Sequence, residues 1–143
     1  MSPPVSRARG RAETAQAVGE EVSTVFPSVA PSAAGARRFV AAALRRRGHP
    51  DDFVELVLLL TSELVTNAYR HARTETRVSV RFDGACVRIE VRDVGGGEPQ
   101  LRPIDTNRVD GRGLQIVDAL ADRWGYDASP GGTAVWFELV RLP

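Results

Sequence analysis

The feature that most constrains this chain is a long helical pattern near its middle that carries an acid and an amide. The stretch from Leu59 to Ala72 reads LLTSELVTNAYRHA. With Glu63 as the zero of a helical wheel and about 100° per residue, Asn67 lies about 40° to one side and Arg70 about 20° to the other. These three side chains form one polar stripe. Burying a carboxylate or an amide without partners costs several kcal/mol, so the rest of the chain must supply partners for this stripe.

Apolar residues cover the opposite side of the same helix. Upstream, residues 53–60 read FVELVLLL and are apolar nearly all round, which indicates burial. The residues of the apolar face opposite the stripe are Val57, Leu64, Val65, Ala68 and Ala72. The pattern therefore predicts a helix packed on a core, with its polar stripe at a site.

The other periodic patterns predict the remaining helices and strands. In chain order we expect an edge strand over residues 21–26, a helix over 31–47, the long helix over 50–74, strands over 76–82 and 85–92, a helix over 114–121, and strands over 123–128 and 133–140. Asp83-Gly84 predicts a tight hairpin turn between the strands over residues 76–82 and 85–92. Because the helices are grouped rather than alternating with strands, the fold class is α+β: a two-layer α/β sandwich in which a mixed β-sheet carries helices on one face.

The bulk properties of the chain restrict the class of protein. With 143 residues it forms one domain, which we expect over residues 21–143 after a disordered tail over residues 1–20. A net charge of +1 gives no case for a nucleic-acid or membrane surface. The single cysteine, Cys86, forms no internal disulfide and is expected to be a small buried hydrophobe in a strand. No apolar run is long enough to span a bilayer and no signal peptide is evident, which predicts a soluble cytoplasmic protein.

Three glycine motifs follow the long helix. Residues 93–97 read DVGGG directly after a predicted strand, residues 111–114 read GRGL at the start of a predicted helix, and residues 132–133 read GT at the start of the last strand. Each alone is weak, since it could equally be a plain turn or a flexible start of a helix. Glycines allow backbone N–H groups to approach phosphates closely, and a helix N-terminus adds free donors and the positive end of its dipole.

Taken in this order and spacing, the stretches resemble the Bergerat-fold ATP-binding domain of the gyrase, Hsp90, histidine kinase and mismatch-repair ATPase family. Glu63 to His71 resembles the N box of that family, residues 93–97 match its DxGxG pattern, and residues 111–114 match its GxGL pattern. Gly132-Thr133 looks like its third glycine position. The resemblance runs from about residue 21 to the end of the chain and implies the histidine-kinase-like ATPase fold. LTSELVTNA and GRGL…ALADRWG look like the stand-alone actinobacterial members, the anti-sigma factor serine/threonine kinases.

The resemblance implies a site for ATP and Mg²⁺. In it Glu63 is the general base on the incoming serine or threonine hydroxyl, and Asn67 is the protein ligand of Mg²⁺. Asp93 accepts a hydrogen bond from the adenine amino group, and Thr133 supports that contact. The nucleotide-binding residues that it implies are Asn67, Arg70, Asp93, Gly95, Gly97, Gly111, Arg112, Gly113, Leu114 and Thr133. Two assignments stay open: Arg70 or His71 balances phosphate charge, and Arg108 or Arg112 is the lid arginine on the γ-phosphate.

The resemblance implies a kinase that is also an anti-sigma factor, with a sigma factor and an anti-anti-sigma protein of the STAS type as its partners. The protein would hold the sigma factor inactive and phosphorylate the antagonist. The alternative is an ATP-dependent binding regulator that transfers no phosphate; the presence of Glu63 favours the kinase. A structural domain with a coincidental set of motifs is the third reading. Family analogy also implies a homodimer.

Overall fold

The computed structural model of the chain describes residues 20–27, 32–71, 75–93, 112–129 and 132–143. Its elements follow the order that the sequence predicts. They are β1 (Glu21–Phe26), α2 (Ser32–Arg46), α3 (Asp51–His71), β2 (Thr76–Asp83), β3 (Cys86–Asp93), α4 (Arg112–Leu120), β4 (Arg123–Ser129) and β5 (Gly132–Val140). The expected disordered tail lies almost entirely outside the described residues. The two-layer α+β class is confirmed.

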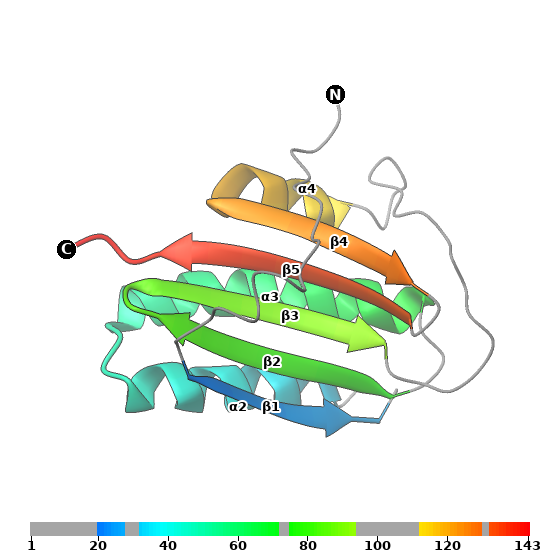
Figure 1. Ribbon diagram of the computed structural model, residues 1–143, viewed down its shortest axis with the longest axis horizontal. Helices are drawn as coiled ribbons and strands as arrows, with labels where there is room; N and C mark the ends of the chain where they lie inside the picture. Colours follow the sequence, from blue (N-terminus) through cyan, green and yellow to red (C-terminus); the bar gives the residue numbers. More distant parts are fainter. Residues whose placement is uncertain (1–19, 28–31, 72–74, 94–111, 130–131) are drawn as a thin grey trace.

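The strands form one sheet in the order β1-β2-β3-β5-β4, which is seen face-on in Figure 1. Every pairing between the described strands is antiparallel, so the expectation of a mixed sheet is wrong. β1 and β2 are antiparallel because two helices, one out and one back, connect them. β3 and β4 run in the same direction, and α4 lies between them along the chain. In the sheet, however, β5 lies between these two strands and pairs antiparallel with both.

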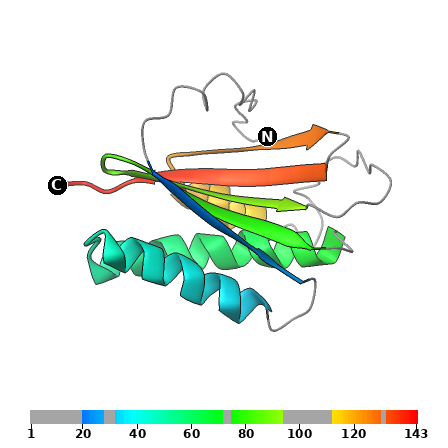
Figure 2. The same ribbon diagram turned by 60° about the horizontal axis from the view of Figure 1, so that its bottom comes forward.

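The helices cover one face of the sheet, as Figure 2 shows. Side chains alternate across the strands, and one side of each strand points into a single apolar core. α2 packs on α3, and α3 also contacts α4, β3 and β5. Leu60 and Leu64 of α3, Ile89 of β3 and Phe137 of β5 are among its most deeply buried members. The turn of the β2–β3 hairpin needs Gly84, whose φ of 64° lies in the left-handed region that side chains disfavour.

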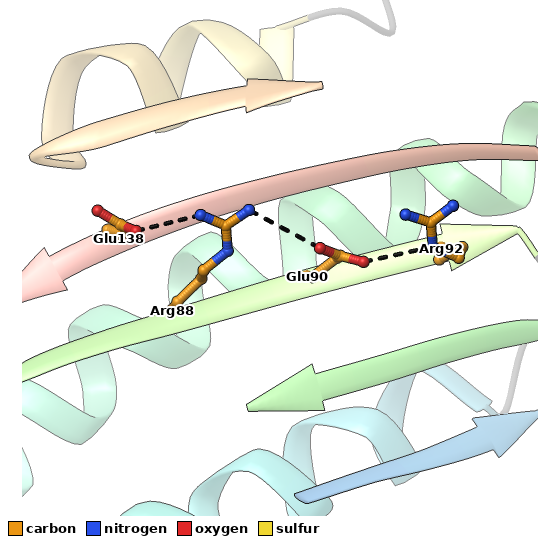
Figure 3. A network of polar contacts seen from close by, with 4 residues as sticks. All are labelled: Arg88, Glu90, Arg92 and Glu138. Atoms are coloured by element: carbon orange, nitrogen blue, oxygen red, sulfur yellow. Dashed lines mark hydrogen bonds and ion pairs between the residues drawn. The ribbon is translucent and has the colours of Figure 1, made fainter. Parts of the chain in front are cut away.

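The other face of the sheet carries a ladder of charged side chains along β3 and β5, drawn in Figure 3. Arg88 contacts Glu138 at 3.2 Å across the β3–β5 pairing, and Arg92 contacts Glu90 at 3.3 Å. The ring of Trp136 lies beneath this ladder, with the Arg88 guanidinium 4.0 Å from its centroid. Opposite charges on paired strands stabilise the pairing and keep this face polar.

Cys86 begins β3 and is partly buried rather than fully buried. Burial first, and the nearby Glu138 carboxylate second, raise the pKa of its thiol to about 11. Because the thiolate is the nucleophilic form, Cys86 stays an unreactive thiol near neutral pH, as its place in a strand suggested.

His49, in the turn between α2 and α3, is buried and contacts residues of α3, of β2 and of the segment after β5. Its ring stacks on Phe53 at 5.1 Å and on Phe82 at 6.1 Å between centroids. Arg141, beyond β5, donates a hydrogen bond from Nε to His49 Nδ1 at 3.0 Å. Sequence reasoning gave this histidine no role, because two of its partners, Phe82 and Arg141, are far away along the chain.

This contact predicts a loss of stability in mild acid. Burial first, then Arg141 and Arg47, lower the pKa of His49 below its ordinary value of 6.5. As pH falls through about 6.5, the unfolded chain therefore takes up a proton that the folded chain refuses, and the free energy of unfolding decreases. We expect the melting temperature to fall between about pH 7.5 and pH 5.5, and to fall less in His49→Gln, which cannot titrate. If the melting temperatures of wild type and His49→Gln fell by the same amount with pH, the acid sensitivity would not come from His49.

Candidate functional site

α3 carries the polar stripe. Asp51 and Asp52 in its first turn complement the positive end of the helix dipole, and the amide of Val54 donates to the carbonyl of Pro50 at 3.0 Å. Asn67 lies near the far end of the helix and is only 8% exposed, whereas Glu63 is half-buried. The buried residues of α3 thus fix the helix on the core of the domain, and the Asn67 side-chain amide is largely shielded from water.

The stripe lies at the margin of the buried face of α3 rather than directly opposite the core. Leu60 and Leu64, beside it on the wheel, are completely or almost completely buried. Leu59 and Thr66, on its other side, are exposed. A side chain at such a margin, like that of Glu63, can reach solvent or a ligand without leaving its helix. The backbone of Arg70 continues α3, and its side chain lies outside the described residues.

Antiparallel register brings Asp93 and Thr133 to one end of the sheet. Asp93 ends β3 and is paired with Thr76 at the start of β2. Arg92 is paired with Ala134, so Asp93 and Thr133 are the next residues outward on the neighbouring strands. Both are partly buried, and each lies two residues from a core-facing residue of its strand, Val91 or Val135, so both point toward the helix layer.

The end of α3 that carries Asn67 lies at this same end of the sheet. α3 ends at His71, and β2 begins at Thr76 after a short connection, which fixes the two ends together. Figures 1 and 2 show the C-terminal end of α3, the end of β3 and the start of β5 on the same side of the molecule. The fold therefore gathers Asn67, Asp93 and Thr133 at one end of the two layers.

Thr76 is a polar residue at this end that sequence reasoning missed. It is 2% exposed, and its Oγ1 has no hydrogen-bond partner within the described ranges. A buried hydroxyl without a partner costs roughly 1–3 kcal/mol, so this atom is suited to a hydrogen bond with a bound group. Its position opposite Asp93 in the register is the only signal that could have found it, and that register is not written in the local sequence.

The start of α4 forms another part of the candidate site. Arg112 and Gly113 form its first turn, where backbone N–H groups have no partner within the helix. Leu114 is 1% exposed and belongs to the core with Val117, so its side chain anchors the helix and only its backbone can meet a ligand. α4 contacts α3, the helix that bears the stripe, and Figure 1 shows the start of α4 on the side of the molecule where β3 ends.

The remaining predicted site residues fall where the structure gives no description. Gly95, Gly97 and Gly111 lie outside the described residues, as does the candidate lid residue Arg108. The side chains of Arg112 and His71 are likewise outside them. For the described residues, the structure brings together the helical stripe, the end of β3, the start of β5 and the start of α4.

The two described side chains of the stripe, Glu63 and Asn67, are available to contact a ligand or a metal ion. No hydrogen bond or ion pair of the Glu63 or Asn67 side chain is found within the part of the chain that the structure describes. In the same part, no group of three or more His, Cys, Asp and Glu side chains is placed to hold a metal ion. A magnesium ion that keeps water and phosphate ligands needs only one or two protein oxygens, and the buried Asn67 amide can provide one. Among the described helices, none is long and apolar enough to cross a membrane.

Comparison with known proteins identifies the domain. The sequence model of the family described as "Histidine kinase-like ATPase domain" matches residues 26–139, from the last residue of β1 to within β5. The match covers the three helices that the structure describes and every candidate residue of the site. No curated protein matches the chain.

Proposed function

The chain belongs to the histidine kinase-like ATPase domain family, and we propose that it is an ATP-binding anti-sigma factor that phosphorylates a serine or threonine of a STAS-type anti-anti-sigma protein. Membership of the family supports ATP binding and an ATP-using activity. The observation that carries the proposal is the convergence of Asn67, Asp93 and Thr133 at the end of the domain where α4 begins.

In the proposed site, β3 and β5 bind the adenine of the nucleotide, and the start of α4 binds its triphosphate. Asp93 accepts the hydrogen bond of the adenine amino group, with Thr133 beside it on β5. The triphosphate lies at the start of α4, where Arg112 and Gly113 present backbone donors and the positive end of the dipole. Asn67 would hold Mg²⁺ together with the phosphates, and the bound ion would supply positive charge to the transferred group.

Glu63 carries the proposed chemistry. It lies one turn before Asn67 on the same face of α3, so its carboxylate is near the metal-bound phosphates. As general base it accepts the proton of the substrate hydroxyl while the hydroxyl oxygen attacks the γ-phosphorus and ADP leaves. The half-buried setting of Glu63 gives a protein substrate access to it.

Calorimetric titration with ATP and phosphate transfer to candidate STAS-type proteins test the proposal. We expect saturable ATP binding that strengthens with Mg²⁺, and transfer of the γ-phosphate to a serine or threonine of the partner found by pull-down with ATP. ATP binding without transfer to any such partner would favour the second function, a nucleotide-dependent binding regulator. The absence of saturable binding would rule out the nucleotide site itself.

A further inference from the structure

α4 is too short to hold its own position. It has nine residues, and isolated helices of this length are marginal in water, so its placement depends on tertiary contacts. Its buried apolar residues, Leu114 and Val117, lie close together on one face. Together with the partly buried Ile116 they fix which face meets the core, but apolar contacts are non-directional and set the rotation of a helix less sharply than a hydrogen bond does.

One polar contact fixes this rotation. The indole Nε1 of Trp124 donates a hydrogen bond to Oδ1 of Asp118 at 2.9 Å. Trp124 is 1% exposed and is held on β4 opposite Phe137, so its ring is a rigid part of the sheet. Asp118 lies on α4, one residue after Val117. A hydrogen bond from a buried donor to a carboxylate is short, directional and stronger than a neutral one.

The junction after α4 is fixed to the sheet as well. The amide of Ala121 donates to the carbonyl of Val117 at 2.8 Å, which continues the helical pattern. The amide of Asp122 donates to the carbonyl of Glu138 at 2.9 Å. The side-chain Oδ2 of Asp122 accepts a hydrogen bond from the amide of Val140 at 2.7 Å. These bonds hold the C-terminal end of α4 in place, so the Trp124–Asp118 bond sets the rotation of the helix about that end.

We infer that Trp124 and Asp118 are positioning residues for the phosphates: their hydrogen bond sets the direction in which the first-turn N–H groups of α4 point. The inference rests on the proposed function, in which the triphosphate lies at this helix start. Adenine contacts belong to β3 and β5, which the bond does not touch. Loss of the bond should therefore weaken the binding of phosphate-bearing nucleotides and spare the binding of adenosine.

The chain offers a matched pair of variants to test this. Trp124→Phe removes the bonded N–H, whereas Trp136→Phe removes an N–H that is also buried but has no hydrogen-bond partner within the described ranges. Affinities for ADP with Mg²⁺ and for adenosine are measured by competition against a fluorescent ATP analogue. In Trp124→Phe we expect ADP to bind about tenfold more weakly and adenosine to change by less than about twofold. Trp136→Phe should change neither, and Asp118→Asn, which keeps an acceptor oxygen, should lose less than Asp118→Ala.

A second measurement reads the position of α4 without nucleotide. Hydrogen exchange at the amides of residues 114–117 should be faster in Trp124→Phe than in wild type and unchanged in Trp136→Phe. Equal losses of ADP and adenosine affinity, or unchanged exchange in Trp124→Phe, would overturn the inference. If wild type binds neither ADP nor adenosine, the proposed function fails. The exchange measurement alone then decides whether the bond positions α4.

Discussion

Glu63→Gln is expected to lower phosphate transfer about 10²–10⁴-fold while ATP still binds. The substitution keeps the size and polarity of the side chain at the margin of α3 but removes its ability to accept a proton. The half-buried position and the lack of a partner within the described ranges predict little loss of stability. Single-turnover transfer of labelled γ-phosphate to the STAS-type partner measures the chemical step, and calorimetry measures ATP binding on the same samples.

Glu55→Gln is the matched control for this prediction. Glu55 lies on the same helix, is exposed, and is about 80° away from Glu63 on the wheel. It should leave transfer unchanged, so an effect restricted to Glu63 cannot come from a general change in the charge of α3. Transfer at the wild-type rate by Glu63→Gln would show that another group accepts the proton.

Asp93→Asn is expected to weaken ATP binding by about tenfold to a hundredfold and to reduce the selection of adenine. A carboxylate accepts from the amino group of adenine, whereas an amide can also donate to the carbonyl that replaces it in inosine triphosphate. The affinity for inosine triphosphate should consequently fall less, or rise. Titrations of both nucleotides into wild type and variant measure the preference directly.

Asp83→Asn provides the control for Asp93, since Asp83 is exposed at the hairpin turn at the opposite end of the same pair of strands. It removes the same charge from the sheet without touching the proposed site. An Asp93→Asn protein that keeps both the affinity for ATP and the preference over inosine triphosphate would place adenine elsewhere.

The sequence predicts the local structure well because local patterns determine it. Alternating residues and Asp83-Gly84 predict the β2–β3 hairpin, whose strands the structure places within one residue of expectation. The apolar run from Phe53 predicts α3, and the wheel places Glu63 and Asn67 together on it. The structure adds that this stripe lies at the edge of the buried face, which depends on where α4 packs.

What the sequence does not reveal is the pairing of distant segments. The insertion of β5 between β3 and β4 joins residues that are far apart along the chain, and no local pattern predicts it. His49 gave no periodic signal, because its partners Phe82 and Arg141 come from other elements. The Trp124–Asp118 bond crosses the end of a helix, where neither helical nor strand periodicity applies.

The central place of β5 also bears on how the molecule folds. Arg88 and Glu138, which meet across β3 and β5, are separated by 50 positions in the chain, and closing such a loop costs entropy before any contact repays it. β4 and β5 form a local hairpin from Arg123 to Val140 and can pair early, as can β1, β2 and β3 with their helices. Docking of the hairpin on β3 then becomes the slow, non-local step. Because that step brings Thr133 alongside Asp93, the proposed nucleotide site is completed only when the last part of the sheet closes.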